Sequence, residues 1–154
     1  MSKTVKFKVE GKPFGKQRPK TATRVIKTVD GGYKKFTRAY TPKQTVEYEQ
    51  AVRLAYVSQA NGYKFPEGTP LAVKVVAHYQ EPKSMTKKNK GLVASGRLFP
   101  LVKPDLDNVC KSIFDSLNGI AFKDDANIVS ANLRKQYTDG EPYVEVEISE
   151  YLLE

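Results

Sequence analysis

The segment "KPDLDNVCKSIFDSLNG", residues 103–119, decides the fold, because it places an acidic motif at the start of an amphipathic helix. Pro104 disfavours helix at Lys103, so the helix begins after it. From Asn108 onward the apolar residues recur at helical spacing, and Asn118-Gly119 ends the helix. The apolar stripe consists of Val109, Cys110, Ile113, Phe114 and Leu117. Asp105 and Asp107 are therefore predicted to lie at the junction between a loop and a helix.

Two interpretations of this acidic pair stay open on spacing alone. An Asp at a helix start caps free N–H groups and meets the positive end of the helix dipole, which explains one Asp but not two. Alternatively, a helix and a short return loop bring Asp124 and Asp125 close to Asp105 and Asp107. Carboxylates that converge without Cys or His suit Mg²⁺ or Mn²⁺.

Lys111 follows Asp107 by four residues, so both lie on one face of the predicted helix. As an ion-pair partner of Asp107 it would be an ordinary surface lysine. As a site residue it can stabilise a developing oxyanion or position and activate a water molecule. Asn108 is either a helix cap or, as we favour, a side chain that orients a neighbouring carboxylate.

Four further segments alternate apolar and polar residues and are predicted to be strands. Their ranges are 4–10, 69–80, 128–137 and 143–149. A helix is predicted over 41–62, with Thr41 as N-cap and Gln44 completing a capping box. A hairpin turning at Asp30-Gly31-Gly32 and a short helix over 87–95 complete the pattern. We expect one domain, 1–154, of the α+β (mixed α/β) class, with one mixed sheet packed by two main helices.

The charge balance predicts an anionic partner. The 154 residues contain 26 Lys and Arg against 17 Asp and Glu, a net charge of +9. This excess suits nucleic acid, a phosphorylated ligand or a membrane surface, or it serves solubility alone. Two basic segments, 12–38 with interleaved aromatics and 83–103, are the predicted DNA surface. The candidate phosphate contacts are Lys16, Arg18, Lys20, Lys87, Lys88 and Lys103.

Several other classes of site are excluded or disfavoured. Cys110 and His78 each stand alone, so an internal disulfide, a thiolate zinc site and a His-rich metal site are excluded, and a Ser/His or Cys/His triad is disfavoured. His78 lies in a strand-like run, which favours the core or the sheet surface. No signal-peptide or membrane-spanning stretch is present, so we expect a soluble, cytoplasmic protein of a bacterial or phage-infected cell. No phosphate-binding G-x-x-x-x-G-K loop supports a phosphotransferase.

The segment "KPDLDNVCKSIFDSLNGIAFKDDANIVSANLRKQY", residues 103–137, resembles the signature of the RusA family of Holliday junction resolvases, endodeoxyribonucleases of bacteria and their phages. The N-terminal loop, first helix and basic connection of the family also resemble this chain. The matching segments are "GKPFGKQRPK" (11–20), "YTPKQTVEYE" (40–49) and "KSMTKKNKGLVASG" (83–96). The likeness therefore spans nearly the whole chain.

This resemblance implies which residues act. It implies that Asp105, Asp107 and Asp125 bind a catalytic metal, with Asp124 as an additional candidate, and that Lys111 is needed for cleavage. It further implies a homodimer of mixed α/β fold that resolves four-way junctions and related branched DNA by hydrolysis in recombination and repair. The rival hypothesis is a non-catalytic basic DNA-binding module, in which the acids cap helices and the basic segments alone bind the DNA. Mg²⁺-dependent nicking of a four-way junction discriminates between the two.

Overall fold

A computed structural model describes residues 3–153. Its central layer is a mixed four-stranded sheet in the order β1-β6-β4-β5. The strands are β1 (Thr4–Glu10), β4 (Leu71–Gln80), β5 (Ile128–Thr138) and β6 (Tyr143–Glu150). β4 and β5 pair in parallel, whereas β6 pairs antiparallel with both β1 and β4. The predicted α+β fold with a mixed sheet is confirmed.

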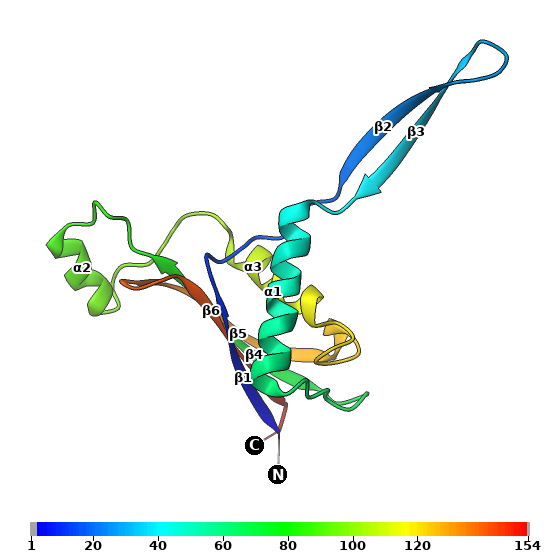
Figure 1. Cartoon of the computed structure of the whole chain (residues 1–154). Coiled ribbons are helices and arrows are strands. Elements are labelled where there is room, and N and C mark those ends of the chain that lie inside the picture. The colour runs from blue at the N-terminus through cyan, green and yellow to red at the C-terminus, as the bar shows by residue number, and fades with distance from the viewer. Residues whose placement is uncertain (1–2, 154) are drawn as a thin grey trace.

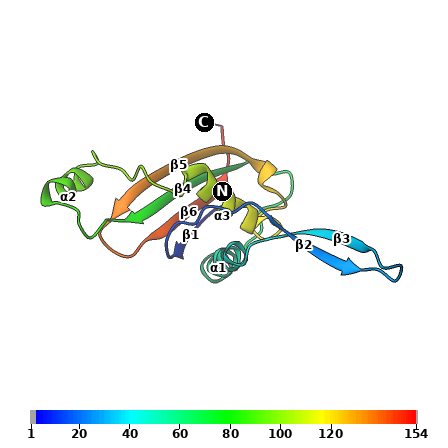
Figure 2. The same cartoon turned by 90° about the horizontal axis from the view of Figure 1, so that it is seen from above.

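Two helices, α1 (Lys43–Ala60) and α3 (Leu106–Leu117), pack on one face of this sheet (Figures 1 and 2). Alternating residues of β1 point into the core, as the sequence pattern predicted. On α3 the buried side includes Val109, Ile113 and Leu117, all fully shielded from solvent. One hydrophobic core therefore holds the sheet, α1 and α3 together and fixes the direction in which the polar side of α3 points.

The start of α1 differs from the predicted capping box. Pro42, not Thr41, occupies the N-cap position, and no side chain caps the first turn. Gln44 accepts a hydrogen bond from Gln17 (3.2 Å), so its side chain turns towards the N-terminal loop and away from the cap. The predicted end is correct, because Asn61 adopts a left-handed conformation (φ 54°) that stops the helix.

The predicted hairpin forms a separate two-stranded sheet of β2 (Lys20–Lys27) and β3 (Tyr33–Tyr40). It projects away from the rest of the molecule beyond the N-terminal end of α1 (Figure 1). The turn is closed by a hydrogen bond from the Thr28 amide to the Gly32 carbonyl (2.8 Å). Gly31 has a positive φ of 85°, which a glycine adopts without strain. The predicted turn at residues 30–32 is confirmed.

The remaining elements are short. α2 (Lys87–Ala94) has no buried residue, and Thr86 caps it by accepting a hydrogen bond from the Asn89 amide (3.2 Å). A 3₁₀ turn, η1 (Asp125–Asn127), leads into β5. His78 is buried on the sheet and stacks against Tyr143, which agrees with the structural role predicted for it. No helix within residues 3–153 has the length and apolarity needed to span a membrane.

Candidate active site

The acidic pair lies at the first turn of α3, where the sequence placed it. Asp105 occupies the N-cap position, and Asp107 lies in the first turn. The Asp105 side chain makes no capping hydrogen bond; its carboxylate instead pairs with the Lys103 ammonium at 2.8 Å. The structure therefore gives Asp105 a cationic partner in place of the cap that was one interpretation of the motif.

One side of α3 carries a row of charged residues at successive turns: Asp107 and Lys111, which are exposed, and Asp115, which is half-buried. Lys111 makes no ion pair with Asp107, or with any other acid, among residues 3–153. The alternative interpretation of Lys111, as an ordinary ion-pair partner of Asp107, is therefore not what the structure shows. Asp115 was missed by the sequence reasoning, although its spacing of eight residues from Asp107 was a signal for it.

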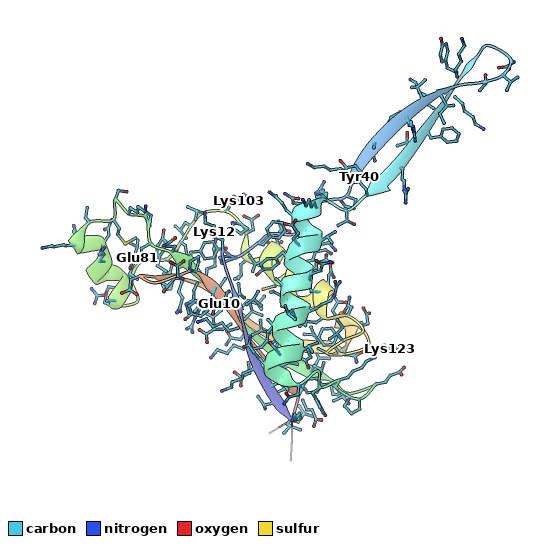
Figure 3. The ribbon with its side chains drawn as sticks, viewed as in Figure 1. Glu10, Lys12, Tyr40, Glu81, Lys103 and Lys123 are labelled. Atoms are coloured by element: carbon cyan, nitrogen blue, oxygen red, sulfur yellow. The ribbon has the colours of Figure 1, made fainter. Side chains whose placement is uncertain are left out.

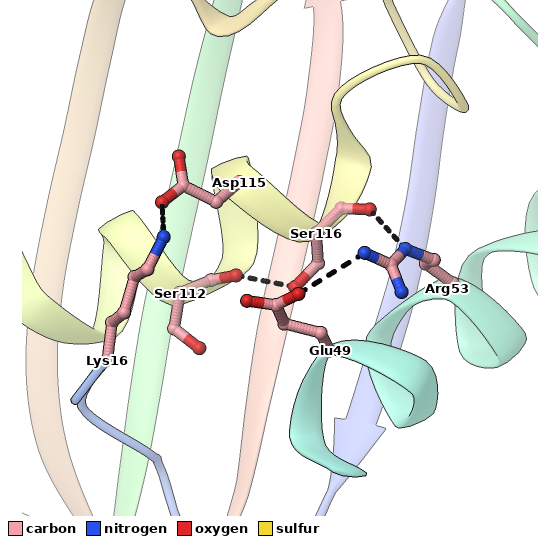
Figure 4. A network of polar contacts seen from close by, with 6 residues as sticks. All are labelled: Lys16, Glu49, Arg53, Ser112, Asp115 and Ser116. Carbon is pink, nitrogen blue, oxygen red and sulfur yellow. Dashed lines mark hydrogen bonds and ion pairs between the residues drawn. The ribbon is translucent and has the colours of Figure 1, made fainter. Parts of the chain in front are cut away.

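Lys16 reaches this row from the N-terminal loop, residues 11–19. Its ammonium lies 2.5 Å from the Asp115 carboxylate, and both side chains are about three-quarters shielded, with exposures of 28% and 22% (Figure 4). The loop is held close to α3, because the Lys16 amide donates to the Asn108 carbonyl (3.4 Å). At Gly15, a Cβ would come within 2.9 Å of the Pro104 side chain, so a larger residue would push the loop off the motif.

Asp125 approaches the same region from the return loop after α3. Its amide donates to the Asn118 side-chain oxygen (2.9 Å), which ties η1 to the end of the helix. Burial raises the pKa of Asp125, and the hydrogen bond and like charge of Asp124 and the like charge of Asp115 raise it further. These neighbours show that Asp115, Asp124 and Asp125 lie near one another.

The carboxylate oxygens of these Asp residues are the kind of ligand that a hard divalent cation such as Mg²⁺ prefers. A cation bound beside Asp125 would favour the charged form of this carboxyl, whose pKa is raised by burial and by the like charges of Asp124 and Asp115. Their positions do not already form a metal cage: within residues 3–153, no three Asp, Glu, His or Cys side chains are arranged to hold a metal. Asp115 is near enough to Asp125 for its charge to raise the pKa of that carboxyl, whereas Asp105 pairs with Lys103 at the start of α3.

The motif is fixed from two sides. The Tyr79 hydroxyl on β4 donates to the Pro104 carbonyl at 2.6 Å, which anchors the segment before α3. Burial raises the pKa of Tyr79 to about 12, with a smaller contribution from Asp105, so this donor stays protonated. From α1, Arg53 donates to the Ser116 carbonyl (3.1 Å) and pairs with Glu49 (3.2 Å; Figure 4). These contacts hold both ends of α3.

The predicted DNA contacts fall into two groups. Lys16 and Lys103 point their ammonium groups at carboxylates of the site. The other candidates have exposed side chains: Arg18 in the N-terminal loop, Lys20 at the start of β2, and Lys87 and Lys88 on α2. Their contacts with phosphate stay a prediction.

Comparison with known proteins identifies the family to which this chain belongs. The profile of the family described as "Endodeoxyribonuclease RusA" matches residues 10–149, nearly the whole chain. A curated relative, "Uncharacterized protein YqaN" of Bacillus subtilis (strain 168), is 33% identical over 148 residues, which cover 95% of this chain and 96% of that protein. The matched region includes every residue of the candidate site.

Proposed function

The chain belongs to the RusA family of endodeoxyribonucleases, and from this premise we propose that it is a Mg²⁺-dependent resolvase that cuts Holliday junctions by paired, symmetric nicks. Family membership supports a Holliday junction resolving nuclease. The observation that carries the finer proposal is the charged side of α3, Asp107, Lys111 and Asp115, with Asp125 close to its far end. A non-catalytic DNA-binding module has no need for acids that repel phosphate at this position.

Asp105, Asp107 and Asp125 are the proposed metal ligands, with Asp124 as an additional candidate. All are oxygen donors of the kind that Mg²⁺ accepts, and Mn²⁺ is the alternative cation. When bound, such a metal lowers the pKa of a water molecule and stabilises the charge that develops on the phosphate. Asn118 orients the loop that carries Asp125 through its hydrogen bond to the Asp125 amide.

Lys111 is proposed to act on the reacting phosphate. Its side chain is exposed on the same side of α3 as Asp107 and has no acidic partner within the described chain. An ammonium held there by a packed helix can meet the negative charge of the transition state without first breaking an ion pair.

A homodimer is proposed because a junction needs two symmetric nicks. A two-fold dimer presents two identical sites related by the same symmetry as the pair of strands to be cut. The expected test of the dimer is the molar mass in solution by sedimentation equilibrium, with and without a synthetic four-way junction. A monomeric mass in the bound state would overturn this part of the proposal.

The activity is tested with a synthetic four-way junction labelled on one strand at a time. We expect nicks in Mg²⁺, at symmetric positions in two opposite strands, and none in EDTA. A linear duplex of the same sequence is the control for branch dependence. Binding of the junction without nicking in Mg²⁺ or Mn²⁺ would instead support the non-catalytic DNA-binding module.

A further inference from the structure

The hairpin β2–β3, residues 20–40, forms a sheet of its own and does not pack into the hydrophobic core. We call it the arm. Every residue of its two strands is exposed. Figure 3 shows its side chains spreading to both sides of the ribbon, from Tyr40 at the base to the tip. An isolated two-stranded hairpin is only marginally stable in water. The arm is therefore built to contact something outside the described chain.

The pairing register divides the arm into two faces, because residues directly opposite each other point to the same side. The first face contains Lys20, Ala22, Arg24, Ile26, Lys34, Phe36, Arg38 and Tyr40. The second contains Thr21, Thr23, Val25, Lys27, Tyr33, Lys35, Thr37 and Ala39. The contact between the Thr23 and Thr37 hydroxyls (3.4 Å) lies on the second face and agrees with this division.

The two faces differ in charge. The first face carries four cations, whereas the second carries two, Lys27 and Lys35. Neither strand contains an acid, and each cation of the first face lies opposite an uncharged residue: Tyr40, Ala22, Phe36 or Ile26. The cations of the first face are thus left for an external anion, with Phe36 and Tyr40 between them.

We propose that the first face of the arm binds a duplex limb of the DNA substrate in its major groove. This inference rests on the proposed function for the identity of the anion. A two-stranded ribbon is one of the structures that the major groove admits. Eight residues at about 3.3 Å each give a ribbon of about 26 Å, a little less than one turn of duplex at about 34 Å. A second copy of the arm is disfavoured as the occupant, because the two faces would meet with like charges.

The arm is also connected to the site. β2 begins four residues after Lys16, whose ammonium lies against Asp115. The N-terminal loop that packs on α3 therefore continues directly into the arm. A duplex limb bound to the arm would therefore lie next to the N-terminal loop. This loop is fixed to α3 by the Lys16–Asp115 pair.

The test compares two double variants that each remove one cation from β2 and one from β3. Arg24→Ala/Arg38→Ala changes the first face, and Lys27→Ala/Lys35→Ala changes the second. Binding to a short duplex is followed by fluorescence anisotropy over a range of salt concentrations, in EDTA so that no cleavage occurs. The first variant is expected to lose about tenfold or more in affinity, and to reduce the log–log salt slope by about 1.8, or about 0.9 for each lost phosphate contact. The second is expected to stay close to the wild type.

Equal losses in both variants would mean that general charge and not a defined face attracts the DNA, and this would overturn the proposal. Unchanged binding in both would place the DNA elsewhere. A change of oligomeric state in the first variant, with unchanged DNA affinity, would assign the arm to a second copy of the chain. A wild-type protein that binds the duplex through this face but never nicks a junction would contradict the proposed function and leave the arm proposal intact.

Discussion

Among single residues, two acids of the site, Asp105 and Asp115, each have a lysine partner. Lys103 pairs with Asp105, and Lys16 pairs with Asp115. The Lys103–Asp105 pair is exposed, and exposed pairs contribute about 0–1 kcal/mol to stability, so this pair can open for another cation at little cost. These lysines offset part of the negative charge of the carboxylates at the site.

The motif at residues 103–119 allowed part of the site to be predicted from the sequence. Pro104, the two Asp residues and the apolar stripe locate the start of α3, and four-residue spacing places Lys111 beside Asp107. The contact of Lys16 with Asp115 joins residues 99 apart in sequence, so no local pattern contains it. Asp115 could have been found from its helical spacing, but spacing alone does not show that the return loop brings Asp125 close to it.

Lys111→Ala is expected to slow the chemical step without unfolding the protein. The side chain is exposed, so its loss leaves the core intact, but it removes the proposed donor to the transition state. Single-turnover cleavage of a four-way junction should fall by a factor of about 10²–10³. Lys111→Arg keeps the charge with a different shape and should restore only part of the rate.

Metal binding by Lys111→Ala, followed by calorimetry, serves as the control and should be retained. A near wild-type rate would return Lys111 to the role of an ordinary surface lysine. Loss of metal binding would mean that it organises the carboxylates and does not act on the phosphate.

Asp115→Asn tests the residue that the structure adds to the site. Removing its charge lowers the negative potential at Asp125, so a higher Mg²⁺ concentration should be needed for half-maximal cleavage. The matched control is Asp139→Asn, which removes the same charge from an exposed position in the turn before β6. The Mg²⁺ dependence of junction cleavage is the measurement, and equal behaviour of the two variants would remove Asp115 from the site.

Among the secondary-structure elements, α3 connects the hydrophobic core to the charged side chains of the candidate site. Its buried side packs against α1 and the sheet, and this packing sets the direction of the charged side. The periodicity of the sequence was enough to predict this helix and the strands, because each buries one face at a regular spacing. The start of α1 was placed wrongly, because the chain enters the helix from the arm and Pro42 stays extended.

Ile113→Ala is expected to destabilise the fold by about 2–5 kcal/mol, the range for truncating a large aliphatic side chain in a core. Ile113 is fully buried, at 0% exposure. Leu54→Ala is the matched control on α1, because Leu54 is 71% exposed and its truncation should change the unfolding free energy little. Chemical denaturation gives both values, and equal effects would contradict the packing of α3 described here.

In the molecule as a whole, the N-terminal loop links the site to the arm, because Lys16 pairs with Asp115 and β2 begins at Lys20. The net charge of +9 predicted an anionic partner, and the arm concentrates six of the cations on two strands without a single acid. The sequence predicted the hairpin but not its separation from the main sheet. Strand order depends on pairings between distant segments, such as β1 with β6, which local periodicity does not specify.

We propose that the acids of α3 and its return loop make this member of the RusA family a metal-dependent nuclease. Asp107→Asn tests it most directly, because the substitution keeps the size of the side chain and removes one charge from the proposed ligand set. The measurement is single-turnover nicking of a synthetic four-way junction in Mg²⁺, paired with binding of the same junction in EDTA. We expect nicking to be lost while binding persists or tightens, because a carboxylate that repels phosphate is gone. Nicking by Asp107→Asn at the wild-type rate would contradict this proposal.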